Sequence, residues 1–302
     1  MTKAKDMVLG ALVADAASLG LHWLYDQSRI AELAGATPEF RATTAEDFAG
    51  VPSYFAHPTK SVGDISQYGE QCLVLLRALA ETGSYDQATY EATFAAHFGP
   101  GGAYVGYIDH ATRETLANLA LGSDDRSEFP GAQDTQLPAV AKLPALIAAG
   151  QDQHVIAAIR TTNNCQVAED YGLVASAMLI AARDGASMET IVQAGLNAAP
   201  AEIRPALQSA CDARDTSTEA LTAEIGMACE LSYGLPSIMH NLLSAPDYIS
   251  AVRRNILAGG DSCGRAMLLG AIAGVVHGVP AHWSERLHCA DTVHALLYKL
   301  QL

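Results

Sequence analysis

The chain has 302 residues, of which 50% are hydrophobic and 17% are charged, and its formal net charge is −15. This length and apolar content are enough for a sizeable core, in one large domain or two ordinary ones. The negative charge excludes a nucleic-acid partner, which needs clustered lysine and arginine, and disfavours an anionic membrane surface. Aromatic residues make up only 6% of the chain, which favours closely packed helices over a β-sandwich.

The cysteines and the start of the chain indicate the compartment. The six cysteines form no CxxC or CxH pair and lie mostly in apolar helical settings, so free buried thiols are expected. The chain starts without an apolar signal segment, and its longest apolar run is too short to span a bilayer. We therefore predict a reducing, cytoplasmic location and no membrane partner.

Helical periodicity begins with the first residues. A first helix is expected over residues 5–20, where Asp15 interrupts an otherwise apolar pattern. Its carboxylate must be paired, hydrated in a cleft or bound to a cation, because an isolated buried charge is very costly. The long loop over residues 34–62 is expected to be functional, since loops of this length are uncommon in compact domains.

The rest of the chain continues the helical pattern. No run of alternating β-branched residues bounded by hairpin turns is found, a polar flexible segment covers residues 122–136, and prolines such as Pro236 mark expected helix boundaries. We predict an all-α fold, a compact single domain over residues 1–302 with roughly a dozen helices. After a helix that ends at Gly83, helices are expected over residues 86–98, 110–121, 137–149, 152–160, 167–183, 187–198, 201–212, 217–232, 247–257, 263–277 and 284–300.

Two helix starts carry acidic residues. Gly63-Asp64-Ile65-Ser66 opens the helix that ends at Gly83, and Asp64 with Gln67 fits a capping box. Gly259-Gly260-Asp261-Ser262 opens the other, in which small residues recur every fourth position and allow another helix to approach closely. Asp261 is either the N-cap of this helix or a ligand in a cleft.

The three acidic residues Asp15, Asp64 and Asp261 are each awkwardly placed unless they face a shared polar cavity. Mg²⁺ prefers carboxylate and hydroxyl oxygens, with water and substrate completing its shell. Asp64, Ser66 and Asp261 are therefore candidate metal ligands from two distant stretches of the chain.

Other residues are candidates for substrate contacts. His22, next to Trp23 and Tyr25, either holds an aromatic ring of a ligand or packs in the core, and we assign a substrate contact to Tyr25. Cys263, at a helix start, is either a thiolate nucleophile or a small residue that fills a packing gap.

Two polar stretches add further candidates. Residues 99–102, with Gly101 and Gly102, either present backbone amides to a pyrophosphate or form a plain turn, and we also assign a substrate contact to the nearby Tyr104. Asn163, in a polar cluster between two helices, either lines the cleft or caps the next helix.

Taken together, three stretches resemble the ADP-ribosylglycohydrolase family, which includes the dinitrogenase reductase-activating glycohydrolases. They are Gly10-Ala-Leu-Val-Ala-Asp15-Ala, Gly63-Asp64-Ile-Ser66 and Gly259-Gly260-Asp261-Ser262, in the family's order along the whole chain. The resemblance implies a compact all-α fold. It also implies hydrolysis of the glycosidic bond between ADP-ribose and a side chain or small acceptor, assisted by two Mg²⁺ ions.

The chain departs from the family pattern at the metal site. Ile65 stands where the family has a second carboxylate, Cys263 replaces another aspartate, and Gly264 replaces a threonine. An isoleucine and a neutral thiol are poor ligands for Mg²⁺. The prediction is therefore one weakly held Mg²⁺ ion at most, on Asp64, Ser66 and Asp261, instead of a dinuclear site.

These departures resemble the J-crystallin and selenoprotein J branch of the family, as does Gly131-Ala-Gln-Asp134-Thr-Gln136. Three hypotheses follow. The first is a Mg²⁺-assisted ADP-ribosyl hydrolase that holds the ion on Asp64, Ser66 and Asp261 and uses Asp64, Asp261 and His22 as catalytic residues. In this hypothesis Asp15 is an additional carboxylate in the cleft that contacts the substrate. The second is a non-catalytic, crystallin-like protein, and the third is a metal-independent hydrolase that uses the same cleft. The expected partner is an ADP-ribose-containing small molecule or an ADP-ribosylated protein.

Overall fold

The computed structural model describes residues 2–121 and 127–302, and in these ranges helices are joined by loops that contain only isolated β-bridges. The all-α prediction is confirmed. Residues 122–126 of the predicted polar segment lie outside the described ranges. The helices up to residue 160 are α1 (Lys3–Ser18), α2 (Gln27–Ala34), α3 (Ala45–Phe48), α4 (Gln67–Thr82), α5 (Gln87–Phe98), α6 (His110–Leu119), α7 (Pro138–Ala141), α8 (Leu143–Ala148) and α9 (Val155–Arg160), with 3-10 turns at Leu19–Leu21 and Asp152–His154.

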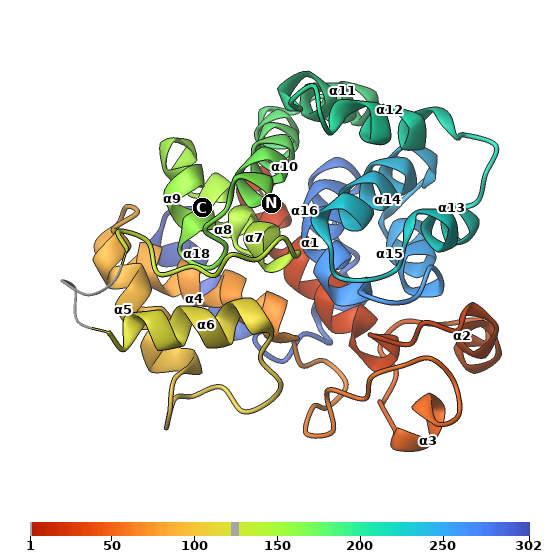
Figure 1. The fold of residues 1–302 in the computed structure, drawn as a ribbon, viewed down its shortest axis with the longest axis horizontal. Coiled ribbons are helices and arrows are strands. Elements are labelled where there is room, and N and C mark those ends of the chain that lie inside the picture. The colour runs from red at the N-terminus through yellow and green to blue at the C-terminus, as the bar shows by residue number, and fades with distance from the viewer. Residues whose placement is uncertain (1, 122–126) are drawn as a thin grey trace.

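The remaining helices complete the bundle. They are α10 (Gln166–Asp184), α11 (Met188–Ala198), α12 (Arg204–Asp212), α13 (Thr218–Ile225), α14 (Leu231–Ser244), α15 (Tyr248–Leu257), α16 (Ser262–His277), α17 (Ala281–Ser284) and α18 (Ala290–Lys299). Figure 1 shows α1 and α16 in the middle, with α4 to α6 on one side and α10 to α15 on the other. The buried core includes residues from all of these groups, which supports the predicted single domain.

The pair α1 and α16 packs through small residues. A Cβ atom built on Gly10 would lie 2.3 Å from the carbonyl oxygen of Gly270, and one built on Gly270 would lie 2.4 Å from the Cβ atom of Ala14. Both helices are almost entirely buried, so the two backbones meet where a larger residue would not fit. The close approach predicted from the small-residue spacing is confirmed, and it holds the N-terminal and C-terminal segments of the chain together.

Several helices differ from the sequence expectations. The expected helix over residues 137–149 is two short helices, α7 and α8, and the one expected over residues 284–300 is α18, which begins at Ala290. Helix α2 begins after Asp26, whose side chain accepts a hydrogen bond from the backbone of Arg29, and was not predicted. The expected single helix over residues 217–232 is wrong, because α13 ends at Ile225 with Gly226 as its C-cap, and α14 begins at Leu231. Pro236 lies inside α14 and is not at a boundary, since the buried apolar face of this helix offsets the hydrogen bond that proline cannot donate.

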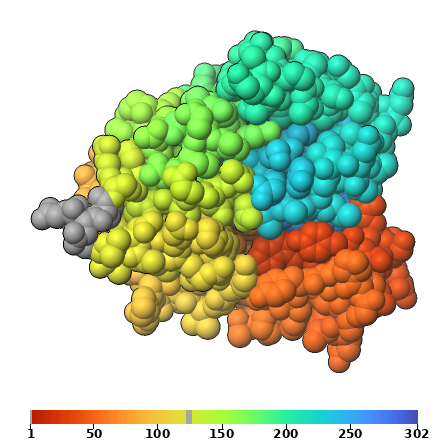
Figure 2. Space-filling model, in the orientation of Figure 1, coloured from red at the N-terminus to blue at the C-terminus, as the bar shows by residue number. Residues whose placement is uncertain are grey.

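The surface brings together segments that are distant in sequence. Figure 2 shows the N-terminal segment, the segment around residues 100–150 and the segment around residues 200–240 meeting on one face. None of the helices in the described ranges combines the length and apolar character needed to cross a bilayer.

Candidate active site

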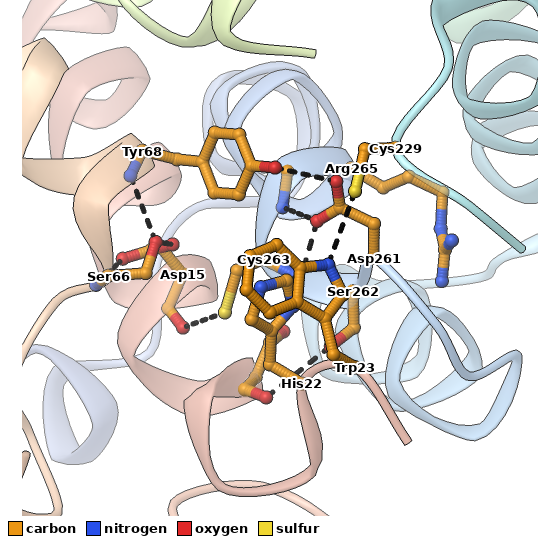
Figure 3. A network of polar contacts seen from close by, with 12 residues as sticks. Asp15, His22, Trp23, Ser66, Tyr68, Cys229, Asp261, Ser262, Cys263 and Arg265 are labelled. Carbon is orange, nitrogen blue, oxygen red and sulfur yellow. Dashed lines mark hydrogen bonds and ion pairs between the residues drawn. The ribbon is translucent and has the colours of Figure 1, made fainter. Parts of the chain in front are cut away.

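Two buried carboxylates lie where three helices meet. Asp15 is on α1, in the middle of its apolar sequence, and Asp261 is the N-cap of α16; neither side chain has exposed surface. Ser66, which is also fully buried, is the N-cap of α4. Figure 3 shows these residues converging from segments that are up to 246 positions apart in the sequence.

Asp15 is paired with the start of α4. Its Oδ2 atom accepts a hydrogen bond from the backbone N–H of Ser66 at 2.7 Å, and its Oδ1 atom accepts one from the Ser66 hydroxyl at 2.5 Å. Burial raises the pKa of Asp15 to about 7, although the bonds from Ser66 oppose this shift. Asp15 is therefore a carboxyl group that holds or releases a proton near neutral pH.

Asp261 is held by two helices. Its Oδ1 atom accepts from the backbone N–H of Gly264 at 2.8 Å, and its Oδ2 atom accepts from the Tyr68 hydroxyl at 2.7 Å. Burial raises the pKa of this carboxyl, opposed by the bond from Tyr68. Asp261 is thus the N-cap of α16, as in the first alternative, and it also lies in a polar network.

A continuous chain of contacts joins the two carboxylates. The Ser66 hydroxyl, which donates to Asp15, accepts from the backbone N–H of Tyr68 at 3.1 Å, and the Tyr68 hydroxyl donates to Asp261. The capping box predicted from the sequence makes Asp64 the N-cap of α4. This prediction is wrong, because the N-cap of α4 is Ser66. Tyr68 is a site residue that the sequence analysis missed. The one sequence feature that could have indicated it is its position two residues after the candidate ligand Ser66.

The glycine pair before Asp261 sets its position. Gly260 has φ +62°, and a Cβ atom there would lie 2.1 Å from the carbonyl oxygen of Met227. The buried guanidinium of Arg265 donates to the carbonyl oxygen of Gly259 at 2.5 Å and to Asn255 Oδ1 at 2.9 Å. Arg265 therefore fastens the turn from which Asp261 extends.

Next to Asp261 lies a set of contacting rings, here called the aromatic cluster: His22, Trp23, Tyr54, His57 and Tyr107. His22 and Trp23 are stacked with ring centroids 4.4 Å apart, and Trp23 contacts Tyr54 at 5.7 Å. Exposure rises along this row, from 1% for His22 to 53% for Tyr54. The cluster is a row of rings from the buried carboxylates to the surface.

His22 is a neutral imidazole. Burial lowers its pKa well below the usual value, and the positive charge of Arg265 acts in the same direction. Its Nδ1 atom accepts a hydrogen bond from the backbone N–H of Cys263 at 3.2 Å and lies 3.6 Å from Asp261 Oδ1. Because Nδ1 accepts and the ring is neutral, the contact with Asp261 is not an ion pair.

Cys263 fits the packing alternative. Its thiol is fully buried, with Sγ 3.6 Å from the carbonyl oxygen of Asp15. Burial and the nearby carboxylates raise the pKa of this thiol. A group that resists ionisation is a poor thiolate nucleophile.

Asp64 points to a different environment. It is half-buried, and its carboxylate accepts from the backbone N–H of Ser61 at 2.7 Å and contacts His288 Nδ1 at 2.9 Å. Burial acts to raise the pKa of Asp64, but the Ser61 and His288 contacts outweigh it and the pKa is lowered. This carboxylate is therefore charged and tied to the exposed segment before α18.

The predicted magnesium ligands do not fit an ion as the structure places them. Within residues 2–121 and 127–302, no three His, Cys, Asp or Glu side chains form a group that could hold a metal. The Ser66 hydroxyl donates to Asp15, both oxygens of Asp261 accept protein hydrogen bonds, and Asp64 is bound to His288. The proposed set of Asp64, Ser66 and Asp261 is thus occupied by contacts within the protein.

The other predicted substrate contacts are dispersed. Tyr25 is half-buried, and the charge of Asp261 is among the influences that raise its pKa, after burial. The Tyr104 hydroxyl donates to the carbonyl oxygen of Tyr107 at 2.9 Å. Gly101 has φ +77° and lies at the surface, and the N–H of Gly102 donates to Gly99, so this stretch is a turn. Their roles in substrate binding remain predictions.

Asn163 belongs to a second buried polar network. It donates to Asp134 Oδ1 at 3.0 Å and accepts from Thr162 at 2.6 Å. Thr162 also accepts from the buried Lys142, whose pKa burial lowers to about 7, opposed by Asp109 and Asp134. This network was not foreseen, because a buried lysine in an apolar helical stretch gives no signal of its partners.

The comparisons with known proteins add the family. The family model described as ADP-ribosylglycohydrolase matches residues 1–301. The chain belongs to this family. It is 28% identical to crystallin J1A of Tripedalia cystophora and 26% identical to crystallin J1B of the same animal, each match covering 94% of this chain and 91% of the crystallin.

A solved structure titled ADP-ribosylglycohydrolase-related protein complex has the same fold. It superposes with a TM-score of 0.70 at 18% identity and covers 99% of this chain and 98% of that one. The resemblance to ADP-ribosylglycohydrolases, and within them to J-crystallins, is confirmed. Since an ADP-ribosylglycohydrolase fold alone does not fix an activity, the function rests on the site.

Proposed function

We propose that this chain is an ADP-ribosyl hydrolase that cleaves the glycosidic bond between ADP-ribose and a protein side chain or small acceptor without a metal ion. The observation that carries this proposal is the pair of buried carboxyl groups with raised pKa values, Asp15 and Asp261, joined through Ser66 and Tyr68. Carboxyl groups whose pKa values are shifted by burial and specific partners are often found at catalytic sites.

The chemistry follows the general scheme of glycoside hydrolysis by two carboxyl groups. Asp15, protonated near neutral pH, donates its proton to the leaving nitrogen or oxygen as the bond to the ribose anomeric carbon breaks. Water adds to that carbon, and Asp261 accepts the proton that the water loses. The acid role goes to Asp15 instead of Asp64, because the contacts of Asp64 lower its pKa and keep it charged. No step uses Mg²⁺, since the predicted ligands do not fit the ion.

Release of ADP-ribose from N-linked and O-linked ADP-ribosylated substrates tests the proposal. We expect release that is the same with millimolar Mg²⁺ and with a chelator. Asp15→Asn should lower kcat by about 10²–10⁴-fold, the usual contribution of a general acid. Asp291→Asn, an exposed aspartate on α18, is the matched control and should keep the activity. Absence of release from every substrate under both conditions contradicts the proposal, as does release that requires Mg²⁺.

One observation favours a second candidate, a non-catalytic crystallin-like protein. Neither carboxylate has exposed surface, and each of their oxygens accepts a hydrogen bond within the chain. Two relatives are also named crystallins. In that case the network only stabilises the fold. No hydrolysis would then be measured, and Asp15→Asn would change stability alone. The cytoplasmic location and the ADP-ribosylated partners remain predictions under either function.

A further inference from the structure

His22 presents an unused hydrogen-bond donor. Its Nδ1 atom accepts a hydrogen bond from the backbone N–H of Cys263, so the ring carries its proton on Nε2. Nε2 is buried and has no partner among the residues that the structure describes. A buried N–H group without an acceptor has lost its hydrogen bond to water and gained none in the protein, so an occupant that accepts a hydrogen bond from it is expected.

His57 has the same property at both ring nitrogens. The side chain is 3% exposed, it lies in the loop between α3 and α4, and within the described ranges neither nitrogen has a partner. Burial lowers the pKa of His57 to about 4, helped by the charge of Lys60, so the ring is neutral at physiological pH. It therefore offers one donor and one acceptor.

The two rings lie side by side. The centroids of His22 and His57 are 5.3 Å apart, and Trp23 stacks on His57 at 5.9 Å with an interplanar angle of 17°. Ring centroids about 4.5–7 Å apart are already in contact, so no further ring fits between these faces. A ligand would instead contact the edges of the two imidazoles. There His22 offers one N–H donor, and His57 offers one N–H donor and one acceptor nitrogen.

We propose that His22 and His57 bind the hydroxyl groups of the ribose next to the scissile bond, with His57 as a positioning residue. This inference rests on the proposed function. Two neighbouring hydroxyls supply an acceptor for each N–H and a donor for the remaining nitrogen. A phosphate that offers acceptors only would leave that nitrogen unpaired. His22 also lies 3.6 Å from Asp261, the carboxylate that the sugar must approach.

Binding of ADP-ribose and of ADP, which lacks the second ribose, tests the assignment without turnover. By calorimetry, we expect the protein to bind ADP-ribose at least about tenfold more tightly than ADP, the equivalent of one or two net hydrogen bonds. His57→Phe keeps the ring shape and should abolish this preference, His57→Asn should restore part of it, and the exposed control His294→Phe should retain it.

The outcomes separate the two proposals. A preference that depends on His57 in a protein without hydrolysis supports the ribose assignment and contradicts the proposed function. The assignment is overturned if His57→Phe keeps both the hydrolysis and the preference for ADP-ribose over ADP. It is also overturned if the unmodified protein binds ADP-ribose and ADP equally, because water alone would then bind the ring nitrogens. If His57→Phe does not fold, nitrogen NMR of the imidazoles decides, since the His57 signals should shift with ADP-ribose and stay unchanged with ADP.

Discussion

Asp15 lies on an apolar helix without exposed surface, and burial is the largest influence on its protonation. Two hydrogen bonds from Ser66 favour the charged form but do not restore the ordinary pKa. The folded protein therefore takes up a proton on Asp15 at a pH where the unfolded chain has already lost it.

The raised pKa of Asp15 makes the stability of the protein depend on pH in a direction that can be measured. The pKa of Asp15 is about 7 when folded and near 3.8 when unfolded, so the folded state binds more protons between these values and its stability falls as pH rises from about 4 to 7. A shift of this size corresponds to roughly 4 kcal/mol in the free energy of unfolding. In Asp15→Asn this contribution is absent, so urea denaturation across the range should give a shallower decline than in the unmodified protein.

Asp109 contributes to the same decline, because burial raises its pKa to about 6. The measurement therefore compares how steeply the free energy of unfolding falls with pH in the unmodified protein and in Asp15→Asn. The contribution of Asp109 is present in both proteins. Equal slopes would contradict the assignment of a raised pKa to Asp15.

At this scale the sequence predicted part of the site. The requirement that Asp15 be paired follows from its apolar surroundings, and the pairing is found with Ser66. The partner of Asp261 did not follow, because Tyr68 lies 193 positions away and no local pattern links them. His57 was missed for a similar reason, since its lack of partners is visible only once the loop is placed.

Helices α1 and α16 show how small residues decide packing at the level of elements. Gly270 meets Gly10 and Ala14 at distances that leave no room for a side chain. The repeat of small residues in α16 made this contact predictable. The position of α14 was not, because Pro236 is a strong local signal that burial of the helix overrides.

Gly270→Ala should therefore destabilise the protein strongly. The new Cβ atom would lie 2.4 Å from backbone and side-chain atoms of α1, so the helices must separate. We expect a loss of about 3 kcal/mol in the free energy of unfolding, at the upper end of overpacking costs.

Gly83→Ala is the control for this change. Gly83 ends α4 with φ +78° and has nothing within 4 Å of a built Cβ atom, so only backbone strain of about 1 kcal/mol applies. Thermal or urea denaturation of both variants checks the order. A larger loss for Gly83→Ala would show that the contact between α1 and α16 tolerates separation.

Across the whole molecule, the acidic groups are divided between separate environments. Asp15 and Asp261 are in the buried network, Asp64 is tied to His288, and Asp134 is in the network of Lys142. The chain therefore distributes its carboxylates instead of gathering them. The fold of an ADP-ribosylglycohydrolase was predictable from three stretches of sequence, whereas this distribution depends on side-chain directions that the sequence does not reveal.

Millimolar Mg²⁺ should consequently leave the thermal unfolding temperature unchanged relative to a chelator. A ligand that binds only the folded state raises stability in proportion to the logarithm of its concentration over its dissociation constant. Differential scanning fluorimetry over a Mg²⁺ series is the measurement, with Ca²⁺ as a control for general ionic effects. A shift specific to Mg²⁺ that disappears in Asp261→Asn would contradict the expectation and restore Asp261 as a ligand.

The position of Trp23 provides a built-in optical probe. The chain has two tryptophans, and Trp283 belongs to a separate group of rings with Phe40 and Tyr248. In a Trp283→Phe background, indole emission comes only from Trp23, whose ring stacks on both imidazoles and whose Nε1 atom donates to Cys229 Sγ at 3.3 Å. Any event that admits water to the aromatic cluster or rearranges its rings changes the wavelength or intensity of that emission. Changes at the site can therefore be followed in real time without a label.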